Sequence, residues 1–131
     1  MIGLIFYGAI TLWVFISLTL TGGPGSDQFV FDVLTLISGN TDIITDFSTN
    51  QNDKIVLSGD VFTSLFGKTD LSANIRNYSA SSVGGDDYIV YDNTTGNVYY
   101  DPTGLSNASA VLIATLQNKP LTMTANQYAV I

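Results

Sequence analysis

The sequence predicts an all-β fold, and two features of its composition lead to that prediction. All 11 acidic residues are Asp, and the chain contains no Glu. Because Asp hydrogen-bonds to its own local backbone and is disfavoured within helices, an all-Asp acidic set favours turns and loops over helix surfaces. The apolar residues are rich in Val, Ile, Phe and Tyr, which fit the pleated surface of a sheet.

The length and charge of the chain narrow the class of protein to which it can belong. At 131 residues and a net charge of -7, it suits a single domain and gives no basis for nucleic-acid binding. The chain has no Cys and no His, which removes the ligands of structural zinc, the Cys nucleophile and the Ser-His-Asp arrangement. Because disulfides cannot form, bound calcium is the more available means of stabilising the fold if the protein works outside the cell.

The first 20 residues form an apolar segment without one charged side chain. Their length is close to the ~20 apolar residues with which a helix crosses a bilayer. No Lys or Arg flanks the segment, and the first basic residue is Lys54, so the sequence predicts no orientation. Three interpretations stay open for residues 1–20: a membrane anchor, a buried pair of apolar strands, or a start foreign to the β domain of residues 21–131.

A glycine-rich turn follows in residues 21–30 and leads into a strand. Gly22, Gly23 and Gly25 allow positive φ angles, so the backbone carbonyls can be turned towards a shared point, to which Asp27 adds a carboxylate. Calcium prefers carbonyl and carboxylate oxygens. The segment therefore either begins a calcium site or is an ordinary turn, since turns use the same residue types.

The next strands surround a second group of Asp residues. The β-rich pattern of residues 29–34 predicts a strand directly after the glycine-rich turn. The pattern of residues 41–59 predicts two short apolar strands that flank a polar loop. Asp42 and Asp46 lie at the two ends of the first of these strands. They either bind a cation or cap the strand ends in water, because paired carboxylates need a cation or solvent to relieve their repulsion.

The last third of the chain predicts an antiparallel hairpin and further strands. Residues 88–91 and 98–101 are apolar, β-rich and separated by the strong turn of residues 92–97. Residues 108–116 predict another strand. The apolar run that ends at Ile131 predicts an edge strand that completes the sheet.

These regions, taken in order, resemble the C-terminal region of RTX proteins, which carry haemolysin-type calcium-binding repeats and leave bacteria by type I secretion. Residues 22–30 match the nonapeptide GGxGxDxUx, with Phe29 at the large apolar position U. Residues 42–58 are similar to the element DxIxDFxxGxDxIxLS, which follows the last nonapeptides in serralysin-like proteases. Residues 91–116 are similar to YDxxTGxxYYDxxG…AxxxATL, which is common near the ends of RTX proteins.

The resemblance implies a fold and a metal site. The fold is a short parallel β-roll edge followed by an antiparallel β-sandwich-like cap, after the apolar N-terminal segment. The implied metal is Ca²⁺, with Asp42 completing a site that the nonapeptide begins, and we expect one ion at most because only one full nonapeptide is present. The residues implied as metal ligands are Gly22, Gly23, Gly25, Asp27, Asp42 and Asp46.

The resemblance also implies a function. We expect a non-enzymatic calcium-binding and secretion or folding module of an extracellular bacterial protein, whose partners are calcium and the type I secretion apparatus, which reads the C-terminus. The chain would stay unfolded where calcium is scarce and fold around the ion outside the cell.

Two other functions are open to the sequence. One is a membrane-anchored extracellular structural or adhesion β domain, with residues 1–20 inserted in the membrane. The other is an enzyme that uses Asp86 with Asp87, or Asp92 with Asp101, as an acid and base pair. Carboxylates in turns, without His or Glu, make the enzyme the weaker interpretation.

Overall fold

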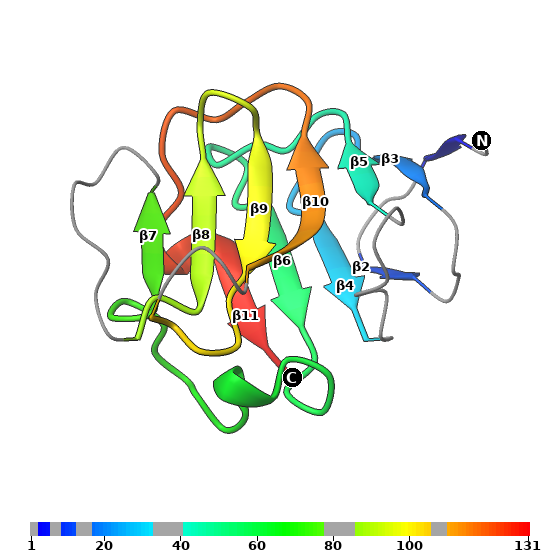
Figure 1. The fold of residues 1–131 in the computed structure, drawn as a ribbon. Helices are drawn as coiled ribbons and strands as arrows, with labels where there is room; N and C mark the ends of the chain where they lie inside the picture. Colours follow the sequence, from blue (N-terminus) through cyan, green and yellow to red (C-terminus); the bar gives the residue numbers. More distant parts are fainter. Residues whose placement is uncertain (1–2, 6–8, 13–16, 33–40, 78–85, 106–109) are drawn as a thin grey trace.

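The computed structural model describes residues 3–5, 9–12, 17–32, 41–77, 86–105 and 110–131. Almost all the regular secondary structure of these residues is β-strand, so the predicted all-β class is confirmed (Figure 1). The described strands form two sheets that face each other. In order across the first sheet they are β1 (Gly3–Ile5), β3 (Thr19–Thr21), β5 (Asp42–Ile44), β10 (Val111–Leu116), β9 (Asn97–Tyr100), β8 (Ile89–Asp92) and β7 (Ile75–Asn77). In the second they are β11 (Tyr128–Val130), β6 (Lys54–Leu57), β4 (Gln28–Phe31) and β2 (Ala9–Leu12).

The N-terminal half of the chain alternates between the two sheets. We call each passage through both sheets a winding: β1 and β2 form the first, β3 and β4 the second, and β5 and β6 the third. Each strand pairs in parallel with the corresponding strand of the next winding. Parallel pairing of this kind places the connecting loops of successive windings one above the other.

Most of the described residues of the apolar N-terminal segment lie in strands. β1 pairs with β3, and β2 pairs with β4, so this segment extends both sheets by one winding. Among the residues that the structure describes, no helix is long and apolar enough to cross a membrane.

The C-terminal half continues both sheets. β10 pairs in parallel with β5, and antiparallel β9 and β8 follow it, with β7 parallel to β8 at the end. The β8–β9 pair is the predicted hairpin, and β10 lies within the predicted strand of residues 108–116, of which 108 and 109 are outside the described residues. β11 completes the second sheet beside β6, as the predicted edge strand.

The core lies between the two sheets and follows the two-residue period of the strands. In β4, Phe29 and Phe31 are buried, and in β6 the side chains of Ile55 and Leu57 occupy the paired positions. The ring of Phe29 packs against that of Phe47, with centroids 6.0 Å apart. The predicted strand of residues 29–34 is therefore β4, while residues 33 and 34 lie outside the described part of the chain.

Candidate site at the stacked loops

The loop between β3 and β4 lies against the loop between β5 and β6. The N–H of Gly25 donates to Gln51 Oε1 at 3.1 Å, and Ser26 Oγ donates to the carbonyl of Asn52 at 3.0 Å. These contacts follow from the strand pairing, because both ends of each loop are held in register by parallel ladders. The glycine-rich turn and the Asp-containing loop, which are separate in the sequence, thus form one unit.

Asp46 binds the glycine-rich turn through its carboxylate. Its Oδ1 accepts from the N–H of Gly22 at 2.9 Å, and its Oδ2 accepts from the N–H of Gly23 at 2.8 Å. Two charge-assisted hydrogen bonds to one carboxylate are a strong, oriented contact. In the structure the N–H groups of these two glycines face Asp46, and the predicted turn of their carbonyls towards an ion stays a prediction.

Asp53 makes the corresponding contact at the other end of the loops. Its Oδ1 accepts from the N–H of Asp27 at 2.9 Å, and its Oδ2 accepts from the N–H of Ser48 at 2.8 Å. The side chain is buried, with 1% of its surface exposed. Asp53 therefore holds the start of β4 to its own loop.

Asp27 is equally buried and lies over the glycine-rich turn. A Cβ added to Gly22 would overlap the Asp27 carboxylate, so the absence of a side chain at position 22 makes room for the acid. The carbonyl of Asp27 accepts from the N–H of Lys54 at 2.8 Å. The glycine and the acid of the nonapeptide are thus directly in contact.

Asp53 lies in the electrostatic field of two other carboxylates of this unit. Burial raises the pKa of Asp53, and the negative charges of Asp27 and Asp46 raise it further, while the hydrogen bonds from the N–H groups of Asp27 and Ser48 lower it. Asp53 is therefore close enough to Asp27 and to Asp46 to interact electrostatically with both. We call these three residues the acidic loop cluster.

Asp42 lies apart from the acidic loop cluster. It begins β5, whereas Asp46 lies two residues beyond the end of β5. Asp42 Oδ1 accepts from the N–H of Leu18 at 2.8 Å, and burial raises its pKa to about 6 although this hydrogen bond lowers it. The structure therefore brings Asp53, which was not predicted as a ligand, to Asp27, and places Asp42 at the opposite end of the strand.

The metal ligation predicted for these residues stays a prediction. Within the described ranges, no three acidic side chains are grouped as they are around a bound metal ion. Asp53 has one sequence signal that could have singled it out: it precedes the second strand of the DxIxDF…DxIxLS element, as Asp27 precedes β4. Only the pairing of β4 with β6 shows that these two positions meet.

The acids considered as a catalytic pair have structural contacts in turns. Asp92 Oδ1 accepts from the N–H and Oγ1 of Thr94, at 2.9 and 2.6 Å. Asp101 Oδ1 accepts in the same way from Thr103, at 2.9 and 2.8 Å. Each acid thus closes a local Asp-x-Thr turn, one at each end of the β8–β9 hairpin.

Asp87 has a different contact. Its Oδ2 lies 3.3 Å from Arg76 Nε, and both side chains are largely buried. This ion pair links β7 to the segment that precedes β8, so it supports the end of the first sheet.

Comparison with known proteins gives no further assignment. No protein-family model matches the chain, and the comparisons with curated proteins and with solved structures find no match. Function is therefore inferred from the residues and geometry of this chain.

Proposed function

We propose that this chain is a non-enzymatic folding module that binds calcium at the acidic loop cluster. Its windings correspond to a short parallel β-roll, and the strands after β6 correspond to the cap that closes it. This is the function expected for the C-terminal region of an RTX-type secreted protein. Folding outside the cell, where calcium is plentiful, is the step that the module controls.

The observation that carries the proposal is that Asp27, Asp46 and Asp53 all lie on one pair of stacked loops. Burial raises the pKa of Asp53, and the negative charges of Asp27 and Asp46 raise it further. A cation near three carboxylates relieves the repulsion between their negative charges, and calcium takes carboxylate and carbonyl oxygens in flexible arrangements. In this unit, Asp27, Asp46 and Asp53 would supply carboxylate oxygens to the ion, although the structure does not group all three around one point.

The hydrogen bonds of the unit are compatible with this role. Each carboxylate oxygen has two lone-pair directions, and a single N–H occupies one of them at each oxygen of Asp46 and Asp53. The bonds from the backbone orient the carboxylates before an ion arrives. Calcium supplies positive charge, while the backbone N–H groups fix the geometry.

Secretion is the second part of the proposal. β11 lies at the edge of the second sheet, and Ile131 is 68% exposed. When calcium is scarce, the unfolded chain presents this apolar C-terminus to the type I secretion apparatus. After export, the same residues pair with β6, so recognition and folding use one segment at different times.

Thermal melting in calcium and in chelator tests the proposal. We expect calcium at tenfold its Kd to add about 1.4 kcal/mol to the free energy of unfolding, because it binds only the folded form. Isothermal titration should give one ion per chain. Magnesium should stabilise less, because it demands a stricter octahedral set of ligands.

Charge-removing variants locate the effect. Asp27→Asn and Asp46→Asn should each abolish most of the calcium-dependent gain, whereas Asp60→Asn, at an exposed position outside the cluster, should keep it. If wild-type melts in calcium and in chelator coincide, the module folds on its hydrophobic core alone and the calcium assignment is wrong.

A further inference from the structure

The outer edges of β1 and β2 lie at the same end of the molecule. β1 is the terminal strand of the first sheet, and β2 is the terminal strand of the second. Figure 1 shows both strands beyond β3 and β4, on the side of the molecule where the N-terminus lies. The two sheets therefore end together in a pair of strand edges, which we call the β1/β2 end.

The pairing of β4 fixes which backbone groups reach β2. The N–H of Ser58 donates to the carbonyl of Phe31 at 3.0 Å, so the backbone groups of Phe31 face β6. Successive residues of a parallel strand direct their N–H and C=O groups to opposite sides. The groups of Gln28 and Val30 therefore face β2.

The same alternation identifies the outward groups of β2. Ala9 is the partner of Gln28, and in a parallel pair the groups of Gln28 bond to the neighbours of its partner. Ile10 therefore bonds to β4. The N–H and C=O groups of Ala9 and Thr11 face away from β4, and no strand of the described residues pairs with them.

β1 follows the same rule. The N–H of Thr45 donates to the carbonyl of Leu20 at 2.9 Å, so the groups of Leu20 face β5 and those of its neighbours face β1. Leu20 is the partner of Leu4, which therefore bonds to β3. Gly3 and Ile5 direct their backbone groups outward.

The β1/β2 end is the uncharged end of an acidic molecule. The 4 basic and 11 acidic side chains all lie at or after Asp27, and the net charge is -7. The edge strands contain neither Pro nor a charged side chain, which are the usual means of blocking an edge against another strand.

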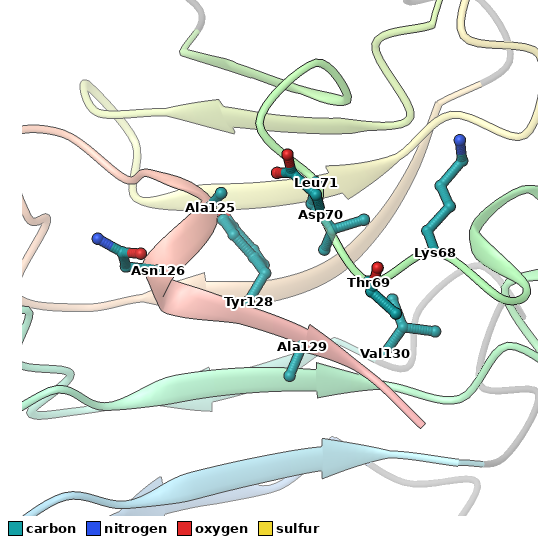
Figure 2. Close-up of a pocket in the computed structure, with 9 residues that line it drawn as sticks. All are labelled: Lys68, Thr69, Asp70, Leu71, Ala125, Asn126, Tyr128, Ala129 and Val130. Atoms are coloured by element: carbon teal, nitrogen blue, oxygen red, sulfur yellow. The ribbon is translucent and has the colours of Figure 1, made fainter.

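The other two edges have neighbours from the same chain. At β7, Asn77 Nδ2 donates to the carbonyl of Met123 at 3.0 Å, and the N–H of Met123 donates to Asn77 Oδ1 at 3.1 Å. At β11, the segment 68–71 lies across a groove of about 400 Å³, which Asn126 also lines (Figure 2). These edges differ from β1 and β2, for which no described segment lies beyond the outer side.

We propose that the β1/β2 end binds the same end of a second copy of this chain. A two-fold axis perpendicular to the sheets places β1 against β1 and β2 against β2, with each pair antiparallel. Both sheets then continue from one copy into the other, and the outward backbone groups of all four strands are paired.

The charge distribution selects a second copy as the occupant. Two molecules that each carry a net charge of -7 repel one another when any charged surface approaches, but the β1/β2 ends of both copies are uncharged. The edge is also complementary to itself, because an antiparallel ladder needs the same N–H and C=O groups from both strands. The contact closes after two copies, so it gives a dimer and no open polymer.

Sedimentation of the full chain over a wide range of concentration tests the proposal, with Thr11→Pro as the variant. Proline removes the outward N–H of position 11 and leaves the bonds to β4. We expect a monomer–dimer equilibrium for the wild type and a rise of about tenfold or more in the dimer Kd for the variant, since each copy loses a donor. A wild-type chain that stays monomeric at every concentration, or one that forms open polymers, overturns the proposal.

Val130→Pro is the matched control at the opposite end of the second sheet. The N–H of Ile131 donates to Leu57 at 3.1 Å, so that of Val130 points away from β6. This variant should dimerise like the wild type. Equal weakening by both variants would show that proline acts through general destabilisation, and association that requires detergent micelles would assign the β1/β2 end to a membrane surface instead.

A distance measurement tests the pairing without relying on proline. The chain has no Cys, so Thr11→Cys carries a single spin label. Antiparallel pairing of two four-residue strands keeps the two labelled Cα atoms within roughly 15 Å. A label at exposed Ser72, introduced as Ser72→Cys, should give no such short distance, and a dimer in which the Thr11→Cys labels are far apart contradicts the proposed interface.

Discussion

The Asp53 carboxylate accepts a hydrogen bond of 2.9 Å from the backbone N–H of Asp27, and this bond joins two windings of the chain. The same kind of contact occurs at two more residues, since Asp42 and Asp46 also accept hydrogen bonds from backbone N–H groups of the preceding winding. All three acids lie in the third winding, at points where the strand ladders begin or end. Carboxylates thus accept hydrogen bonds from backbone N–H groups near the strand ends, where the ladders of the sheets stop.

Asp53→Ala should strongly destabilise the protein. The substitution leaves the N–H groups of Asp27 and Ser48 without their acceptor in a buried position, and relief of the repulsion within the acidic loop cluster offsets only part of that loss. We expect the free energy of unfolding to fall by about 2–3 kcal/mol in urea denaturation.

The matched control for this prediction is Asp60→Ala, which removes an exposed carboxylate of the following loop. It should change the free energy of unfolding by less than about 0.5 kcal/mol. Similar losses for the two variants would mean that the contact between Asp53 and Asp27 contributes little to stability.

Asp42 should make the stability depend on pH between about 4 and 7. Its pKa is raised from 3.8 to about 6 by burial, so the folded state binds a proton more tightly than the unfolded state does. Stability is therefore greatest at low pH for this group and falls as pH rises through the window between the two pKa values. The total change is on the order of 2–3 kcal/mol.

Asp42→Asn isolates this contribution. The amide has no charge to bury and keeps an oxygen for the N–H of Leu18. The variant and the wild type should have similar stability near pH 4, and the variant should be the more stable one above pH 6. Urea denaturation across this range measures the difference, and a difference that does not vary with pH would exclude Asp42 as its source. Asp53, whose pKa is also raised, adds a change of the same sign to both proteins.

Two buried tyrosines should respond in opposite ways to loss of the hydroxyl. Tyr91 Oη donates to the carbonyl of Pro120 at 2.6 Å, and burial raises the pKa of Tyr91 to about 12. Tyr128 Oη is buried and has no hydrogen-bond partner among the residues that the structure describes. Tyr91→Phe should cost about 1 kcal/mol, whereas Tyr128→Phe should be neutral or stabilising.

Thermal melting of the two variants under identical conditions provides the comparison. Each variant is the control for the other, because both remove one oxygen from a buried ring. An equal loss for both would mean that the Tyr128 hydroxyl has a partner that contributes as much as Pro120 does.

Local chemistry explains why part of the fold could be predicted from the sequence. The hairpin of β8 and β9 is specified by neighbouring residues, since Asp92 and Thr94 close the turn and Gly96 takes a positive φ of 81°. The strands themselves follow from short runs of β-formers. These signals lie within a few residues of one another, so no tertiary information is needed.

The candidate site could be predicted only in part, because its contacts cross windings. The glycine-rich turn and Asp46 are recognisable in the sequence as separate features, but the hydrogen bond from the N–H of Asp27 to the carboxylate of Asp53 depends on the register of β4 with β6. The pairing of β10 with β5 also depends on the tertiary structure, because it joins residues more than sixty positions apart in the sequence. No local propensity encodes such a distance.

Gly96→Ala should be among the most damaging single substitutions in the cap. A Cβ at this position would overlap the backbone carbonyl of Leu116, which cannot move without breaking β10 from its neighbours, and the positive φ adds strain. We expect a loss of about 3 kcal/mol or more in the free energy of unfolding. Gly67→Ala is the matched control, because Gly67 has a similar φ of 74° but open space around its Cβ position. It should cost only about 1 kcal/mol, from strain alone. Denaturation of both variants separates strain from overlap, and equal losses would place the whole effect in the backbone angle.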